Sequence, residues 1–168
     1  MKKGISPVIA TVILVAVTLA IAVAIIGWLF GLWGSLAGGT PQVAIPTASL
    51  YLNTTTGYLN ATFYLKNSGA GSDKIIQIDV QFGGSIYKCD LTSNVKTTGT
   101  LSFSNRVIIV PANSAGWVEV VCATNKTLNP ALYNSATVGA SAVLIVKFEK
   151  SGNMPINVVI YNGTAKIS

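Results

Sequence analysis

Residues 8–33 read VIATVILVAVTLAIAVAIIGWLFGLW, an apolar run without a charged side chain. As a helix, about 26 residues at ~1.5 Å each span roughly 39 Å, more than the ~30 Å hydrocarbon core of a bilayer. Thr11 and Thr18 interrupt the run, and a helix can satisfy their hydroxyls internally. Ser6 and Pro7 favour a helix start, because Pro needs no backbone donor at the first helical position. The segment therefore predicts a membrane-competent helix.

Charge is distributed unevenly along the 168-residue chain. No charged residue lies between Lys3 and Lys66, and all five acidic residues lie at Asp73 or later. The net charge of +6 does not indicate a nucleic-acid partner, because the positive residues from Lys66 onward are scattered singly. Binding to phosphates needs a clustered basic stripe. We expect no nucleic-acid partner.

Three interpretations of the N-terminus compete. A secretory signal has an apolar region of only about 7–15 residues followed by a small-residue cleavage site, for which 35–37 (Ser-Leu-Ala) would have to serve. A simple membrane anchor would keep Lys2 and Lys3 in the cytoplasm. In the third interpretation, a cut after Gly4 removes both lysines and leaves the whole helix on the mature protein.

The third interpretation is supported by a family resemblance. Residues 2–17, KKGISPVIATVILVAV, resemble the N-terminus of archaeal type IV pilins and adhesion-filament subunits, which carry a class III signal peptide. The resemblance implies cleavage between Gly4 and Ile5 by a prepilin peptidase. Bacterial pilins usually carry Glu at the position of Ile9, so the resemblance is to the archaeal branch.

The resemblance also implies how the protein works. The subunit would wait in the membrane with a cytoplasmic N-terminus, and an assembly platform with its ATPase would then pack identical subunits into an extracellular filament on the cell surface. The segments expected are a leader at 1–4, a polymerisation helix at 5–36, a linker at 37–46 and an extracellular domain at 47–168. Small residues that would let helices approach closely recur at Ala16, Ala20, Ala24, Gly27 and Gly31.

Beyond residue 42 the hydrophobic period changes to two. Leu59, Ala61, Phe63 and Leu65 alternate with polar or amphipathic residues, and 76–82 show a similar pattern. The pairs at 83–84 (Gly-Gly) and 162–163 (Asn-Gly) suit two-residue hairpin turns. The chain is therefore predicted to be α+β: a long apolar helix followed by an Ig-like antiparallel β-sandwich.

Cys89 and Cys122 each share a strand face with apolar neighbours, so both are expected to point to the interior. In an exported domain they could pair, and closing a loop of 33 residues would then stabilise the fold by about 3–4 kcal/mol. Two separate buried thiols are the alternative. Asn-x-Ser/Thr sequons at Asn53, Asn60, Asn125 and Asn162 are candidate N-glycosylation sites.

No catalytic or metal site is expected. The chain has no His, which removes the usual Ser-His and Cys-His pairs, and the five acids form no paired motif. The cysteines lack metal-ligand spacing. We therefore expect no enzyme activity and no cofactor.

The leading function from sequence is thus a structural pilin of an adhesive surface filament. An archaellin, the subunit of a swimming filament, is an alternative within the same class. A different class is a membrane-anchored extracellular domain that never polymerises and displays a sugar- or peptide-binding site. Tyr58 and Tyr64, on one outer face of their strand, are aromatic candidates for such a site.

Overall fold

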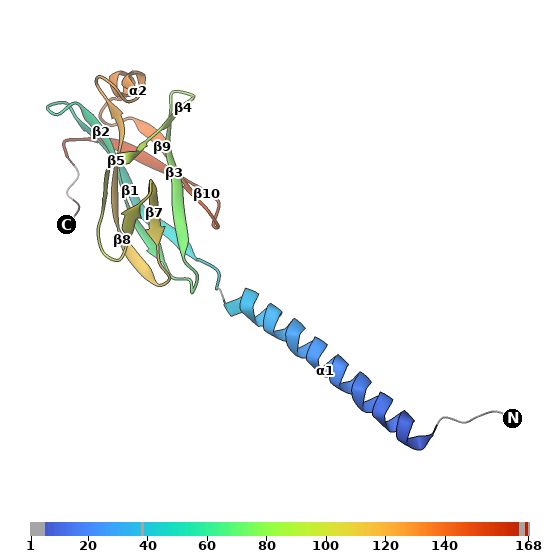
Figure 1. Cartoon of the computed structure of the whole chain (residues 1–168). Helices are drawn as coiled ribbons and strands as arrows, with labels where there is room; N and C mark the ends of the chain where they lie inside the picture. Colours follow the sequence, from blue (N-terminus) through green and yellow to red (C-terminus); the bar gives the residue numbers. More distant parts are fainter. Residues whose placement is uncertain (1–5, 38, 165–166, 168) are drawn as a thin grey trace. The chain divides into compact units, whose positions relative to one another are not determined.

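The computed structural model describes residues 6–37, 39–164 and 167. The chain divides into two compact units, Met1–Gly39 and Thr40–Ser168. The first contains one long helix, and the second contains the strands (Figure 1).

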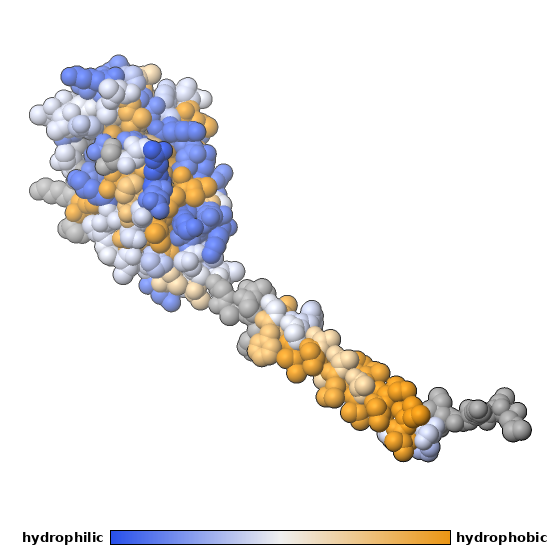
Figure 2. All heavy atoms as spheres, in the orientation of Figure 1, coloured by the Kyte–Doolittle hydropathy of each residue, from blue (hydrophilic) through white to orange (hydrophobic). Residues whose placement is uncertain are grey.

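Helix α1 covers Pro7–Ala37 and begins at the proline, as expected. The hydroxyls of Thr11 and Thr18 donate to the carbonyls of Val8 and Val15 at 2.9 Å each, so the two polar side chains are satisfied within the helix. By length and composition, Pro7–Leu32 can cross a membrane, and none of that window is buried. Figure 2 shows its surface as almost continuously hydrophobic. The predicted N-terminal apolar helix is confirmed.

The five small residues that were expected to support helix packing all lie on α1. A Cβ built onto Gly27 or Gly31 would have no described atom within 4 Å. A packing role for Ala16, Ala20, Ala24, Gly27 and Gly31 therefore stays a prediction.

The described residues of the second unit form ten strands and one short helix. The elements are β1 (Val43–Asn53), β2 (Tyr58–Asn67), β3 (Asp73–Phe82), β4 (Ser85–Lys88), β5 (Asp90–Thr97), β6 (Ser102–Ser104), β7 (Val107–Val110), β8 (Ser114–Thr124), α2 (Pro130–Ser135), β9 (Ser141–Phe148) and β10 (Asn153–Asn162). Strand β1 begins inside the range predicted as a linker, and α2 was not predicted.

The strands are connected in one sheet with the order β5-β8-β2-β1-β10-β9-β3-β7-β6, and β4 pairs with β3. Strand β10 joins one half of the sheet, β5-β8-β2-β1, to the other half, β9-β3-β7-β6. Its residues Asn153 to Val159 pair antiparallel with β9, and Ile160 to Asn162 then pair parallel with β1.

The coarse fold prediction, a helix followed by a mostly-strand domain, is confirmed. The finer prediction, a β-sandwich, needs correction, because the strands of the described residues are hydrogen-bonded into one curled sheet rather than into two separate sheets. Strand β10 passes from an antiparallel partner, β9, to a parallel partner, β1, so the sheet is not wholly antiparallel as predicted.

The concave side of this curled sheet encloses the core. Leu59, Ala61, Phe63 and Leu65 of β2 are all 0% exposed, as their alternation predicted. Leu144, Val146 and Phe148 of β9 contribute from the other half of the sheet.

Two local predictions come out differently. Ile76 was expected to point inward, but a register shift between Ile75 and Gln77 in the β3–β9 pair leaves it 49% exposed and buries Ile75 instead. The 83–84 turn does join β3 to β4, and both glycines have positive φ. Asn162 instead ends β10, and the backbone N–H of Gly163 donates to Leu52.

Cys89 and Cys122 form a disulfide. Cys89 lies between β4 and β5, where the chain crosses from one half of the sheet to the other. Its backbone N–H donates to Ile78 on β3, whereas its sulfur is bonded to β8. The disulfide therefore ties the crossover to both halves of the sheet.

Asp73, at the start of β3, fastens the turn between β9 and β10. Its carboxylate is 1% exposed and accepts from the backbone N–H groups of Lys74, Lys150 and Ser151 at 2.7–3.0 Å, and from the Ser151 hydroxyl. Burial by itself raises the pKa of Asp73. The hydrogen bonds, with Ser151 the strongest, outweigh it and hold the pKa below the ordinary value of 3.8.

Asp73 is expected to make stability depend on acid pH. A carboxyl with a lowered folded-state pKa stabilises the fold fully above its unfolded-state pKa, and the contribution is lost as pH falls through the folded-state value. Asp73→Asn should therefore lower the free energy of unfolding by about 2–3 kcal/mol at neutral pH. The difference in unfolding free energy between this variant and the wild type should shrink below about pH 4. Denaturant titrations at several pH values can measure it. A difference that does not change with pH would contradict this role.

Candidate functional site

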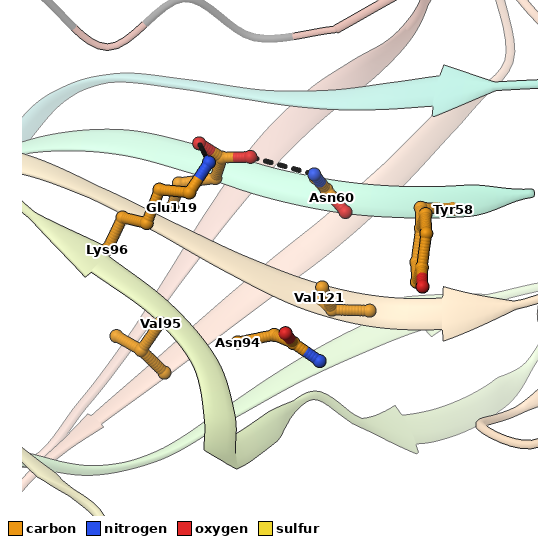
Figure 3. Close-up of a pocket in the computed structure, with 7 residues that line it drawn as sticks. All are labelled: Tyr58, Asn60, Asn94, Val95, Lys96, Glu119 and Val121. Carbon is orange, nitrogen blue, oxygen red and sulfur yellow. Dashed lines mark hydrogen bonds and ion pairs between the residues drawn. The ribbon is translucent and has the colours of Figure 1, made fainter. Parts of the chain in front are cut away.

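The outer face of β2, β8 and β5 contains a pocket of about 300 Å³ (Figure 3). Alternation along β2 turns Leu59 and Ala61 inward and Tyr58, Asn60 and Thr62 outward. The pocket is lined by Tyr58, Asn60, Asn94, Val95, Lys96, Glu119 and Val121.

A short chain of polar contacts runs along this pocket. The Asn60 amide Nδ2 donates to Glu119 Oε1 at 2.8 Å, and Lys96 Nζ lies 3.6 Å from Glu119 Oε2. Glu119 is buried, whereas the Lys96 side chain is 73% exposed. The carboxylate is thus held in place, and its charge is balanced by one largely exposed ammonium group.

Two buried polar atoms beside this chain lack a hydrogen-bond partner among the described residues: Asn60 Oδ1 and Thr62 Oγ1. Thr62 pairs directly with Glu119 across the β2–β8 ladder. Leaving such groups unpaired typically costs about 1–3 kcal/mol each. A buried oxygen of this kind can form a hydrogen bond with water or with a ligand.

A second hollow of about 380 Å³ lies beside the first, and Tyr58 lines both. Its other lining residues are Thr55, Thr56, Gly57, Thr124, Asn125, Lys126 and Thr127. The ring of Tyr58, 41% exposed, therefore lies between two polar hollows.

The four sequon asparagines occupy different environments. Asn125 is exposed in the second hollow, and Asn162 is exposed at the end of β10. Asn53 is half-buried, and its Oδ1 accepts from the N–H groups of Thr55 and Thr56 at 3.0 Å. Modification at each site stays a prediction.

Asn60 is expected to carry no glycan in the folded protein. N-glycosylation bonds the sugar to the side-chain amide nitrogen and leaves it one hydrogen. In Asn60 this nitrogen already lies 2.8 Å from the buried Glu119 carboxylate, so the attached sugar would have to fit beside that contact. Glycopeptide mass spectrometry of protein from its native source should therefore find Asn60 unmodified, whichever of Asn53 and Asn125 is occupied. A glycan on Asn60 at high occupancy would contradict the observed arrangement of the pocket.

The acidic residues serve separate local contacts. Asp79 is 1% exposed and lies 2.9 Å from Lys147 Nζ, and Glu149 lies 3.2 Å from Lys74 Nζ. Among the described residues, no group of three or more His, Cys, Asp or Glu is placed to hold a metal ion. The absence of enzyme activity stays a prediction.

The predicted leader lies outside the described residues, as do Lys2, Lys3, Gly4 and Ile5. Cleavage between Gly4 and Ile5 therefore also stays a prediction. Sequence reasoning singled out Tyr58 and Tyr64 but missed Glu119, Lys96 and Trp117 as neighbours on the same face. Alternation along β8 places Trp117, Glu119 and Val121 together, but only the strand pairing brings them beside β2.

No protein-family model matches the chain, and no curated protein matches it in sequence. Among solved structures it is similar to the copper-bound PCuAC domain from PmoF2, with 15% identity and a TM-score of 0.45 over 74% of this chain and 99% of that one. The apo PmoF2 PCuAC domain gives 16% identity and a TM-score of 0.48, over 77% and 98%. The apo PCuAC domain from PmoF1 gives 16% and 0.43, over 74% and 100%.

These findings correct the function predicted from sequence. The three solved structures named above are PCuAC domains, and the homopolymeric adhesion filament predicted from sequence is not retained. Its implied partners, namely identical subunits, a prepilin peptidase and an assembly platform with its ATPase, are withdrawn with it. The physical reason for the error is that the resemblance covered only the first part of the chain and carried no information about the β domain.

Copper does not follow from the likeness, which is low in both identity and TM-score. The donor atoms present also do not fit this metal. Copper sites use imidazole, thiolate or thioether ligands. The chain has no His, both cysteines are in the disulfide, and Met154 is the one methionine among the described residues.

Proposed function

We propose that the chain is a membrane-anchored extracellular binding protein that acts without polymerising. Helix α1 holds it in the membrane, and the β domain presents the pocket around Glu119 to the outside. The observation that carries this proposal is the coexistence of a helix that can span a membrane with a disulfide-bonded domain whose outer face bears that pocket.

The expected orientation follows from the charges that flank the helix. Lys2 and Lys3 precede α1, and the next charged residue is Lys66. Basic residues close to one end of a span favour the cytoplasm for that end. The β domain then lies outside, where a disulfide persists.

Membrane extraction together with N-terminal sequencing tests the anchor. Carbonate-washed membranes should retain the protein, and its first residue should be Met1 or Ile5, since both leave α1 on the chain. Ala16→Arg with Ala20→Arg should release it, because a central Arg costs about 2.5–3.5 kcal/mol in a span. The matched variant, Ala16→Leu with Ala20→Leu, should remain bound. A mature protein that begins beyond Ala37 would refute the anchor.

A further inference from the structure

On the outer face around the pocket, side chains of neighbouring strands lie side by side in rows that cross the sheet. Tyr51 on β1 pairs with Asn60 on β2 and with Tyr161 on β10, so the three side chains share this face. The rings of Tyr51 and Tyr161 are 5.8 Å apart. In another row, Tyr64 meets Trp117 edge-on at 5.3 Å. Aromatic rings therefore flank the polar chain of Asn60 and Glu119 on two sides.

The polar groups of the pocket form a balanced set of donors and acceptors. Glu119 accepts, Lys96 donates, and the exposed Asn94 amide can do both. Lys96 and Glu119 neutralise each other, so the pocket offers a ligand little net charge. A phosphate or another polyanion would have to separate this pair, which disfavours anionic ligands.

Tyr58 lines both the pocket and the second hollow, so the candidate site extends over both. Tyr58 is partly exposed. The pocket on one side contains two amides and the Lys96–Glu119 pair, and the hollow on the other contains threonine hydroxyls, the Asn125 amide and Lys126. A ligand that fills both must be elongated, must carry hydroxyls on both parts, and must offer a flat apolar patch to the ring.

We infer that this face binds a neutral oligosaccharide, with Tyr58 stacking on one sugar ring and Asn94, Lys96 and Glu119 hydrogen-bonding the hydroxyls of that or the next ring. Sugars combine many hydroxyl groups with apolar C–H faces. A neutral sugar brings no charge that would separate Lys96 from Glu119. A peptide that adds a strand would use a sheet edge, whereas β2 lies inside the sheet between β8 and β1. This inference rests on the outward display proposed above.

Binding by the purified full chain tests the inference. Protein from a host that adds no glycans, kept in detergent micelles, is applied to an array of neutral, sulfated and phosphorylated oligosaccharides, and the neutral ones that bind are titrated by calorimetry. Tyr58→Ala should weaken binding about tenfold, as loss of a central aromatic contact typically does. Glu119→Gln should also weaken it about tenfold. The control Ile86→Ala, on exposed β4, should bind within about twofold of wild type.

Three outcomes would overturn the inference: no neutral oligosaccharide binds the wild type, only anionic ones bind, or Tyr58→Ala binds as the control does. Circular dichroism of each variant separates lost contacts from lost folding, and Tyr58, being exposed, is the safer variant. Because binding is measured on purified protein, its failure leaves the membrane anchor and its orientation untouched. Failure of the anchor would conversely leave the measured binding in place.

Discussion

Replacing Asn67 by Ala is expected to lower the free energy of unfolding of the β domain by about 3–5 kcal/mol. Asn67 is 1% exposed, and its side chain makes four hydrogen bonds. Its Oδ1 accepts from the backbone N–H groups of Gln42 and Gly69 at 3.0 Å, and its Nδ2 donates to the carbonyls of Gly71 and Pro111 at 2.8 Å.

The effect should be large because Ala leaves four backbone groups near the start of β1 without their partner. Asn67→Asp keeps the acceptor but places a carboxylate oxygen against the carbonyls of Gly71 and Pro111, so a loss at least as large as that of Asn67→Ala is expected at neutral pH. Denaturant unfolding can be followed by Trp117 fluorescence in a background with Trp28 and Trp33 replaced by Phe. The matched control is Asn157→Ala, at an exposed position of β10, with a change within about 0.5 kcal/mol. Equal losses for Asn67→Ala and this control would refute the role of Asn67.

Loss of the disulfide is the second large effect. Cys89→Ala with Cys122→Ala should lower the free energy of unfolding by about 3–4 kcal/mol, because the bond closes a loop over a sequence separation of 33. For a domain of this size that corresponds to a fall in Tm of roughly 10–15 °C. Thermal scans of the full chain in micelles, with and without reductant, would measure it.

The reduced wild type is the control for this experiment, since it keeps every heavy atom and lacks only the S–S bond. Reductant should destabilise the wild type and leave the double-alanine variant unchanged. If the variant were as stable as the oxidised wild type, the crossover between β4 and β5 would be held by packing alone, and the stabilising role given to the bond would be wrong.

The sequence predicted those parts of the fold that depend on local pattern. The apolar run from residue 8 foretold α1, the period-two alternation in β2 foretold its buried face, and the two glycines at 83–84 foretold the β3–β4 turn. These features follow from side-chain chemistry within one segment and need no knowledge of partners.

Features that depend on distant pairing could not be predicted. The change of partner within β10 and the register shift that exposes Ile76 are decided by the neighbouring strands. The pocket depends in the same way on β2, β5 and β8 lying side by side, which places Lys96 beside Glu119 and Glu119 beside Asn60. Sequence showed Glu119 only as an isolated acid, and it marked Asn60 as a sequon.

The N-terminal resemblance illustrates a related limit. Its motif describes how a segment is processed and held in a membrane, and it says nothing of what the attached domain binds. A basic leader, a small residue and an apolar helix suit an anchor as well as a polymerising helix, because both need a charge-free span. In the function proposed above, the β domain supplies the binding site.

Labelling of intact cells tests the central claim, that α1 anchors the chain with its β domain outside, most directly. A membrane-impermeant amine reagent, followed by peptide mass spectrometry, should modify exposed lysines of the β domain such as Lys66, Lys96 and Lys126 before lysis. Lys2 and Lys3, where they remain on the chain, should react only after lysis. The account is contradicted if the β-domain lysines react only once the cells are broken.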